Sequence, residues 1–164
     1  MHDELLSQGR VKIGYNTRMD TNSVNALNER LSTDIPLINA MSLRVLSASP
    51  ESVEVDIPFE GNGNDKGTLF AGAAYSAMVL AGWTLAMERA KASGFDNPWA
   101  AIVDAHIHYA KPVRENATAT AVFAEEPNLV PGARNWAKVK VSIGEVVAFE
   151  GTYAVGIFSA RSRG

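Results

Sequence analysis

The feature that most constrains the fold is a stretch of 18 residues, 70–87, without a single charged side chain. Its length is at the lower limit for a helix that spans a membrane. However, it is rich in alanine and glycine and stands alone in an otherwise soluble pattern. A helix that is apolar on all sides is also what a sheet wrapped around it requires. We therefore expect a buried helix that ends at Gly94, and no membrane span.

Shorter elements precede this helix. Apolar residues recur at helical spacing over residues 24–35, with a choice of N-caps at residues 21–23, and Pro36 either closes that helix or starts a turn. Residues 40–46 look extended. Residues 53–59 alternate between apolar and polar side chains, as in a half-buried strand. These two extended segments predict a hairpin.

Strand patterns follow Pro98. They cover residues 101–109, 118–125, 136–143 and 146–158, and the last two predict a hairpin around residues 144–145. Strands that are segregated from one central helix indicate an α+β fold with an antiparallel sheet.

The chain is long enough for one domain with a real core and short for two, at 164 residues. We expect residues 1–22 to form an N-terminal arm or tail and residues 23–160 to form the domain. The N-terminus is acidic and has no secretory pattern, which predicts a cytoplasmic location.

Charge and composition narrow the function. A net charge of −3 with scattered basic residues argues against nucleic acid as a partner, and the lack of cysteine excludes disulfides and thiolate chemistry. The glycines of residues 61–72 have the wrong spacing for a dinucleotide fingerprint, and Ala73 stands where a phosphate loop needs lysine. We therefore expect no cofactor.

The glycine-rich loop of residues 62–72 leads directly into the apolar helix. A helix N-terminus carries unsatisfied N–H groups and partial positive charge. The backbone of Gly72 or Ala73 could therefore donate to a carbonyl oxygen that becomes an oxyanion. Asn64 adds an amide that could orient a water molecule or the carbonyl group.

Polar residues on the first strand after the helix are the other candidates. A regular alternation over residues 101–109 places Asp104, His106 and His108 on one face. Three residues spread over roughly 13 Å of strand cannot all chelate one ion without a bulge. Two neighbours could do so only with a ligand from elsewhere, so we expect no metal site. A catalytic or hydrogen-bonding role for Asp104 or His106 is favoured over metal binding, and a polar sheet face or interface is the plain alternative.

Two blocks of sequence resemble a known family. Residues 64–72, with Tyr75 and the pair Gly82-Trp83, form the first block, and residues 103–109 with Pro112-Val113 form the second. Together they resemble a hotdog-fold family of thioesterase-like domains, some of which are fused C-terminally to bacterial acetyltransferases. The resemblance covers residues 24–160 and is more specific for the fold than for activity.

The resemblance implies an antiparallel sheet wrapped around one long central helix, in a homodimer or a dimer of dimers. It implies a site at the dimer interface for thioesters of coenzyme A or acyl carrier protein, with the thioester carbonyl at the start of the helix. Phe70, Ala73, Tyr75 and Ser76 would then contact the substrate, although core packing explains Tyr75 and Ser76 equally well.

The sequence departs from the better-known hotdog thioesterases at two positions. Phe70 stands where those enzymes have a histidine, and Val79 stands where their helix carries an acidic residue, whereas Asn64 matches their asparagine. Neither Phe70 nor Val79 can act as a base, so acid–base work would come from Asp104 and His106. Three functions stay open: an acyl thioesterase, a non-catalytic acyl-thioester binding or interaction module, and a dehydratase that would depend on His106.

Overall fold

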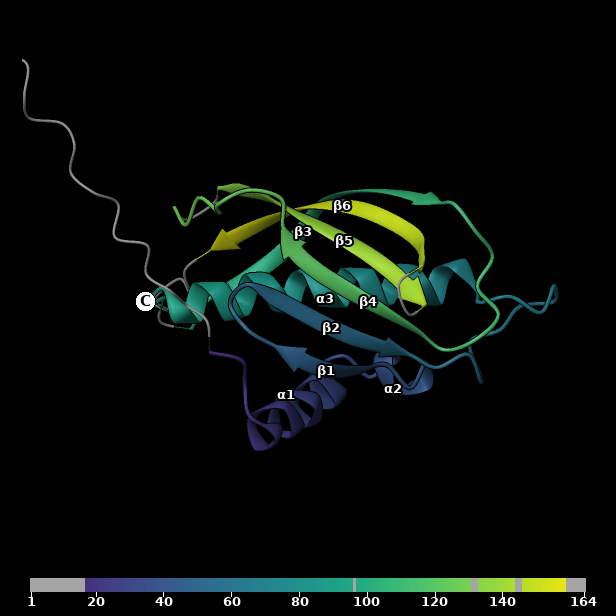
Figure 1. The fold of residues 1–164 in the computed structure, drawn as a ribbon. Helices are drawn as coiled ribbons and strands as arrows, with labels where there is room; N and C mark the ends of the chain where they lie inside the picture. Colours follow the sequence, from purple (N-terminus) through teal and green to yellow (C-terminus); the bar gives the residue numbers. More distant parts are fainter. Residues whose placement is uncertain (1–16, 96, 131–132, 144–145, 159–164) are drawn as a thin grey trace, which may run out of the picture.

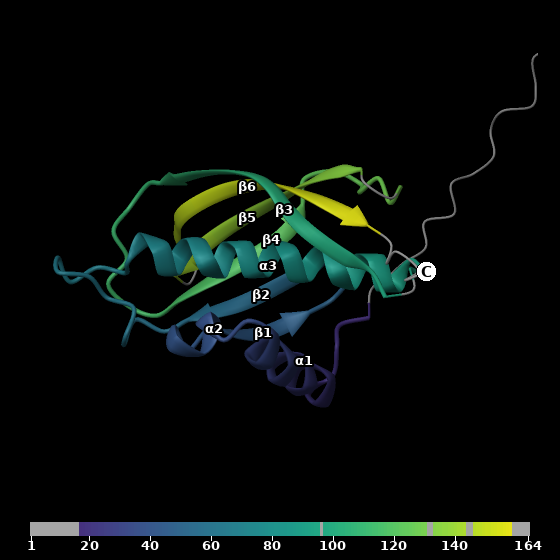
Figure 2. The same ribbon diagram turned by 180° about the vertical axis from the view of Figure 1, so that it is seen from behind.

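One long helix at the centre of the molecule is surrounded by a curved sheet (Figures 1 and 2). The computed structural model describes residues 17–95, 97–130, 133–143 and 146–158. The helices are α1 (Thr21–Asp34), α2 (Leu37–Ala40) and α3 (Ala71–Ala92). The strands are β1 (Arg44–Ala48), β2 (Ser52–Ile57), β3 (Trp99–Tyr109), β4 (Ala117–Phe123), β5 (Arg134–Ile143) and β6 (Val146–Phe158). The predicted α+β class is confirmed.

Helix α3 forms because its alanines, leucines and methionines favour a helix and the sheet covers them on several sides. Fourteen of its 22 residues are buried. It begins after Phe70, whose backbone is extended, and ends before Gly94, which has a φ of 82° that favours glycine. The predicted buried helix is confirmed, starting one residue later. In the described part of the chain, no helix is long and apolar enough to cross a membrane.

The sheet has six strands in the order β1-β2-β4-β5-β6-β3, and every neighbouring pair is antiparallel. Both predicted hairpins, β1–β2 and β5–β6, are present. The turn predicted at residues 144–145 lies outside the described residues. Long helix α3 contacts all six strands, so the inner face of the sheet and the helix form one core.

Strand β3 does not have the regular alternation that the sequence predicts. Its pairing with β6 shifts between Ile102 and Asp104, which marks a bulge at Val103. Before the bulge Ile102 packs on the core, and after it Ala105 and Ile107 do, while Val103 is exposed. The regular alternation predicted for residues 101–109 would put Val103 on the same face as Ala105, so that prediction is wrong at the bulge. Because of the extra residue, the side chains that face the core have even numbers before the bulge and odd numbers after it.

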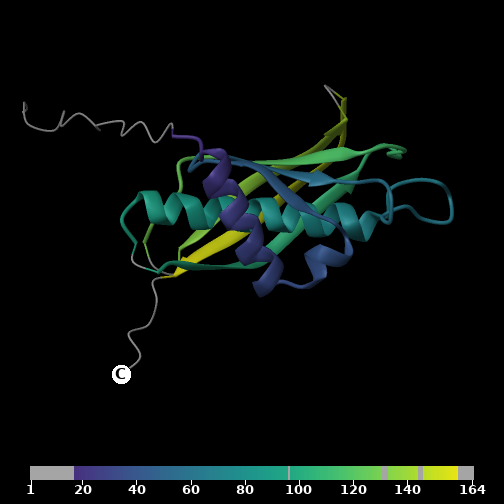
Figure 3. The same cartoon turned by 90° about the horizontal axis from the view of Figure 1, so that it is seen from below.

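Helix α1 lies against β1, and the short helix α2 follows it (Figure 3). The N-cap of α1 is Asp20, whose carboxylate accepts a hydrogen bond of 2.8 Å from the N–H of Ser23. This hydrogen bond lowers the pKa of Asp20. The N-cap predicted at residues 21–23 is therefore wrong. Pro36 precedes α2, so this proline starts a new turn of helix.

Part of the predicted arm belongs to the folded domain. Met19 packs on the core, and its N–H donates to the carbonyl of Ala48 at 2.9 Å. The rest of the predicted arm, residues 1–16, lies outside the described residues.

Asn28 of α1 completes the hydrogen bonding of the outer edge of β1. Its Oδ1 accepts from the N–H of Val45 at 2.8 Å, and its Nδ2 donates to the carbonyl of Val45 at 2.9 Å. The same amide donates to the carbonyl of Val24, one turn earlier in the helix. An amide side chain thus provides the pair of hydrogen bonds that a neighbouring strand would supply.

Replacing Asn28 by alanine is expected to destabilise the protein by about 1–3 kcal/mol, because two partly buried backbone groups of Val45 lose their partners. Thermal unfolding measures the effect. Asn25→Ala is the matched control, since Asn25 is exposed on the same helix. Equal melting temperatures for the two variants would show that the bonds of Asn28 contribute nothing to stability.

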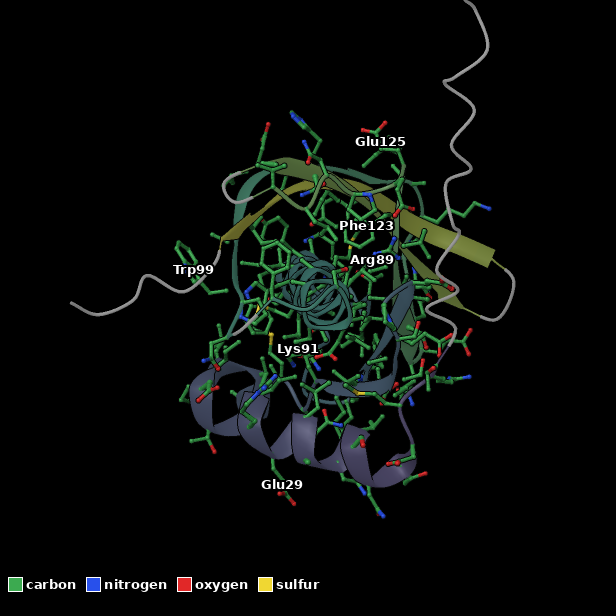
Figure 4. The ribbon with its side chains drawn as sticks, turned by 90° about the vertical axis from the view of Figure 1, so that its left-hand side faces the viewer. Glu29, Arg89, Lys91, Trp99, Phe123 and Glu125 are labelled. Carbon is green, nitrogen blue, oxygen red and sulfur yellow. The ribbon has the colours of Figure 1, made fainter. Side chains whose placement is uncertain are left out.

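Charged residues also enter the core where α3 ends. In the view along α3, Arg89 and Phe123 both lie between the helix and the sheet (Figure 4). Arg89 is buried and forms an ion pair with Glu126, while the buried Glu88 accepts from Lys91 at 2.6 Å. Basic side chains at a helix C-terminus also complement its partial negative charge.

Candidate functional site

The loop before α3 is held closed by the side chain of Asn64. Its Oδ1 accepts from the backbone N–H groups of Lys66 at 2.9 Å and Thr68 at 3.2 Å, and its Nδ2 donates to the hydroxyl of Thr68 at 2.9 Å. Gly67 completes the turn with a φ of 64°, which favours glycine. The amide predicted to orient water or substrate therefore also holds the loop that leads to the helix.

Asn62 connects this loop to the short helix α2. Its side chain is buried and donates to the carbonyls of Met41 at 2.7 Å and Pro58 at 2.8 Å. The N–H of Phe70 donates to the carbonyl of Asn62 at 2.7 Å. These bonds fix the end of α2 beside the start of α3.

Two backbone donors are available at the start of α3. The carbonyl of Phe70 accepts from the N–H groups of Ala73 at 3.0 Å and Ala74 at 3.2 Å. Among the described residues, the N–H groups of Ala71 and Gly72 have no acceptor. Of the two donors predicted from the sequence, Gly72 is the available one, whereas Ala73 is already engaged. A helix N-terminus with unoccupied N–H groups attracts negative charge.

The ring of Phe70 lies over Gly72. A Cβ atom at position 72 would come within 2.8 Å of Cζ of that ring, so the glycine makes room for it. The ring itself is 55% exposed. Phe70 therefore provides an apolar surface next to the two N–H donors.

Tyr109 is a site residue that the sequence does not single out. Its hydroxyl donates to the carbonyl of Ala71 at 3.2 Å, which brings the end of β3 to the start of α3. Burial raises the pKa of Tyr109, and the nearby phenol of Tyr75 raises it further. The hydroxyl of Tyr109 thus stays protonated, and able to donate, throughout the neutral range.

An apolar cavity of about 290 Å³ lies along α3, beyond the first turn. Helix α3 contributes Tyr75, Ser76, Val79, Leu80 and Trp83 to its lining. The opposite walls come from α2 and the residue before it, namely Ile35, Leu37, Ile38 and Met41, and from Ile102 of β3. Tyr75 and Ser76 were predicted to contact substrate. The walls from α2 and β3 could not be anticipated, because they depend on how distant segments pack.

Ser76 directs its hydroxyl toward the helix. Its Oγ donates to the carbonyl of Gly72 at 2.9 Å, one turn earlier. A hydroxyl engaged in this way satisfies its own polarity beside the cavity. Ser76 therefore lines the cavity as a small residue.

Asp104 and His106 lie together, but away from this site within one chain. Nε2 of His106 is 3.6 Å from Oδ2 of Asp104, and the two side chains are 77% and 44% exposed, respectively. They alternate with Ala105 and Ile107, which pack on the core, so they occupy the outer face of the sheet. Within the described ranges, no three histidine, aspartate or glutamate residues gather closely enough to hold a metal ion.

Comparison with known proteins supports a common fold. The chain is similar to a thioesterase-family structure from Shewanella oneidensis with a TM-score of 0.76 at 24% identity, covering 85% of this chain and 99% of that one. It is also similar to a thioesterase from Haemophilus influenzae with a TM-score of 0.72 at 11% identity, covering 86% and 94% of the two chains. At these identities the likeness shows the fold alone, which is the hotdog fold.

A family model described as "Putative thioesterase (yiiD_Cterm)" matches residues 24–157. This match covers α1 from its fourth residue, the whole sheet but its last residue, and α3. The chain therefore belongs to the YiiD C-terminal thioesterase family, on a hotdog fold.

Proposed function

We propose that the protein is a homodimeric hydrolase of acyl thioesters, whose acyl group is joined to coenzyme A or to acyl carrier protein. The thioester carbonyl lies at the start of α3, and the acyl chain enters the cavity beside it. One observation carries the proposal: the unoccupied N–H groups of Ala71 and Gly72 stand one turn before the cavity residues Tyr75 and Ser76.

The chemical step is addition of water to the thioester carbonyl, followed by cleavage of the C–S bond. The electron pair of that bond leaves with the sulfur, and the proton from the water ends on the thiolate. The products are a carboxylic acid and a free thiol. Gly72 is the preferred donor to the oxyanion, because it is partly buried while Ala71 is exposed, and such donors act best where water is excluded.

The base would be supplied by the second copy of the chain in the dimer. Asp104 and His106 occupy the outer face of β3, and β3 is an edge strand of the sheet. Pairing of two β3 strands edge to edge would bring polar residues of the partner close to this region. Light scattering tests the dimer, and a strict monomer at assay concentration would contradict a shared site.

Free thiol released from a panel of acyl-coenzyme A substrates, from short to long chains, measures the proposed activity. Turnover above the uncatalysed rate, saturating with substrate, is the expected result. The panel is repeated with acyl carrier protein substrates, which distinguishes the two carriers. Saturable binding of every substrate without release of thiol would exclude hydrolysis.

Asn64 provides a sharper test of the site. Asn64→Ala removes the acceptor for the N–H groups of Lys66 and Thr68, and we expect kcat to fall about 10- to 100-fold as the loop before α3 loses its geometry. Asn64→Asp keeps that acceptor but loses the amide donor. Recovery of activity by aspartate indicates that Asn64 acts through its oxygen, by positioning the loop. Equal loss in both variants indicates that its N–H groups are required, either toward Thr68 or toward water and substrate.

The second candidate is an acyl-thioester binding module without catalysis. It is favoured by Phe70 and Val79, which place apolar side chains where related enzymes have a histidine and an acid. The assay above distinguishes the two candidates directly.

A further inference from the structure

The cavity beside α3 is a slot that follows the helix for about two turns. Tyr75, Val79 and Trp83 recur every four residues and line it from end to end. Eight residues separate Tyr75 from Trp83, which corresponds to about 12 Å along the helix axis. The slot therefore has a defined length as well as a defined volume.

The length of the slot indicates the size of its ligand. An extended hydrocarbon chain advances about 1.3 Å per bond, from C–C lengths of about 1.5 Å, so about 12 Å corresponds to nine bonds. The thioester carbonyl would lie at Gly72, three residues or about 4.5 Å before Tyr75, which adds about three to four bonds. A chain that reaches from that carbonyl to Trp83 therefore has about twelve to fourteen carbons.

Trp83 closes the slot at the end farther from the start of α3. Its indole N–H donates to the carbonyl of Ala100 in β3 at 2.8 Å, which fixes the ring between helix and strand. Ile102 of the same strand also lines the slot. Because the ring is anchored by a hydrogen bond as well as by packing, it forms a fixed end wall.

The opposite end begins one turn after the unoccupied N–H of Gly72. Ser76 directs its hydroxyl to the helix backbone, and the walls beyond it are apolar. Asn62 fixes the wall of α2 by donating to the carbonyl of Met41. The slot is thus preformed and apolar, and it begins one turn after the polar start of the helix.

We propose that this slot binds a straight acyl chain of about twelve to fourteen carbons, of which the last eight to ten lie in the slot, and that Trp83 sets the upper limit of its length. The inference rests on the proposed function for the position of the thioester, and it names the substrate class. Burial of each further methylene strengthens binding until the chain meets the indole ring, and longer chains must bend or leave the slot.

Binding is measured by calorimetry with acyl-coenzyme A thioether analogues, which cannot be hydrolysed, from four to sixteen carbons. Affinity is expected to rise up to about fourfold per methylene and to stop rising at about twelve to fourteen carbons. A profile that is flat from four to sixteen carbons, or that still rises at sixteen, would overturn the proposal.

Two variants move the limit in opposite directions. Trp83→Ala opens the end wall, and the preferred chain should lengthen by roughly two to four carbons, because the removed ring leaves a cavity. Val79→Phe fills the middle of the slot and should shorten the preferred chain. Trp99→Ala is the control, since Trp99 is exposed and does not line the slot. An unchanged preference in Val79→Phe, or in a folded Trp83→Ala, would overturn the role of the slot.

The same panel separates this inference from the proposed function. Analogues that bind with the expected length limit, while true thioesters release no thiol, would contradict hydrolysis and support the slot. Hydrolysis with no dependence on chain length would support the enzyme and contradict the slot.

Discussion

Replacing Gly72 by proline is expected to lower kcat for the best acyl thioester about 100- to 1000-fold, the usual effect of losing one oxyanion donor. The substitution deletes the N–H that has no acceptor among the described residues. Proline lacks that hydrogen and costs no intrahelical bond in the first turn of a helix. It disfavours the helical backbone of the preceding Ala71, so the retention of α3 has to be measured. Steady-state kinetics measure the loss, and circular dichroism measures whether α3 is retained.

Two neighbouring variants serve as controls. Ala71→Pro also places proline in the first turn, after Phe70, whose extended backbone accepts a following proline. Because Ala71 is the more exposed donor, its loss should affect kcat much less. Gly72→Ala keeps the N–H and displaces only the exposed Phe70 ring, so most of kcat should remain. A folded Gly72→Pro protein with the kcat of Ala71→Pro would exclude Gly72 as the special donor.

The largest effect on stability is expected at Gly151 of β6. A Cβ atom there would lie 2.8 Å from Cε of Met78, 3.0 Å from Cγ1 of Ile107 and 3.2 Å from the carbonyl oxygen of His106. Gly151→Val should therefore destabilise the protein by about 1–3 kcal/mol or more, because the helix and the sheet have no room to separate locally. Thermal unfolding should show a drop of several degrees, with Gly151→Ala in between.

The cause can be tested with a second substitution. Met78 is fully buried, so Met78→Ala alone should also destabilise the protein. Combined with Gly151→Val, however, it removes the closest contact and should cost less than the sum of the two single changes. Gly63→Ala is the control, since its nearest neighbour would be the Phe59 ring at 3.5 Å. Additive effects at Gly151 and Met78 would contradict this explanation.

The sequence predicts those parts of the fold whose signal is local. The uncharged stretch predicts α3, and alternation predicts the β1–β2 and β5–β6 hairpins. The bulge at Val103 has no local signal, because the pairing of β3 with β6 decides it. The cap at Asp20 was missed because residues 21–23 offer the same chemistry, and only the backbone path selects among them.

The same distinction holds for the candidate site: the sequence predicts its local features but not its contacts between distant segments. A glycine-rich loop before an apolar helix indicates a site at its N-terminus. The sequence predicts that the donor is Gly72 or Ala73, without deciding between them. It does not predict that the carbonyl of Phe70 engages Ala73. Nor does it predict that Tyr109 reaches Ala71. These contacts depend on packing between segments that are distant in sequence.

The hydrogen bonds of Asn28 have a consequence for how many copies of this chain can join. A sheet that can pair at both edges can add subunits in both directions, and such growth ends only in a fibre. Here one amide side chain occupies the backbone groups of Val45, so at this residue β1 has no free groups for the strand of another copy, and β3 is the other edge strand. If the proposed dimer pairs through β3, Asn28 acts against the addition of further copies at β1.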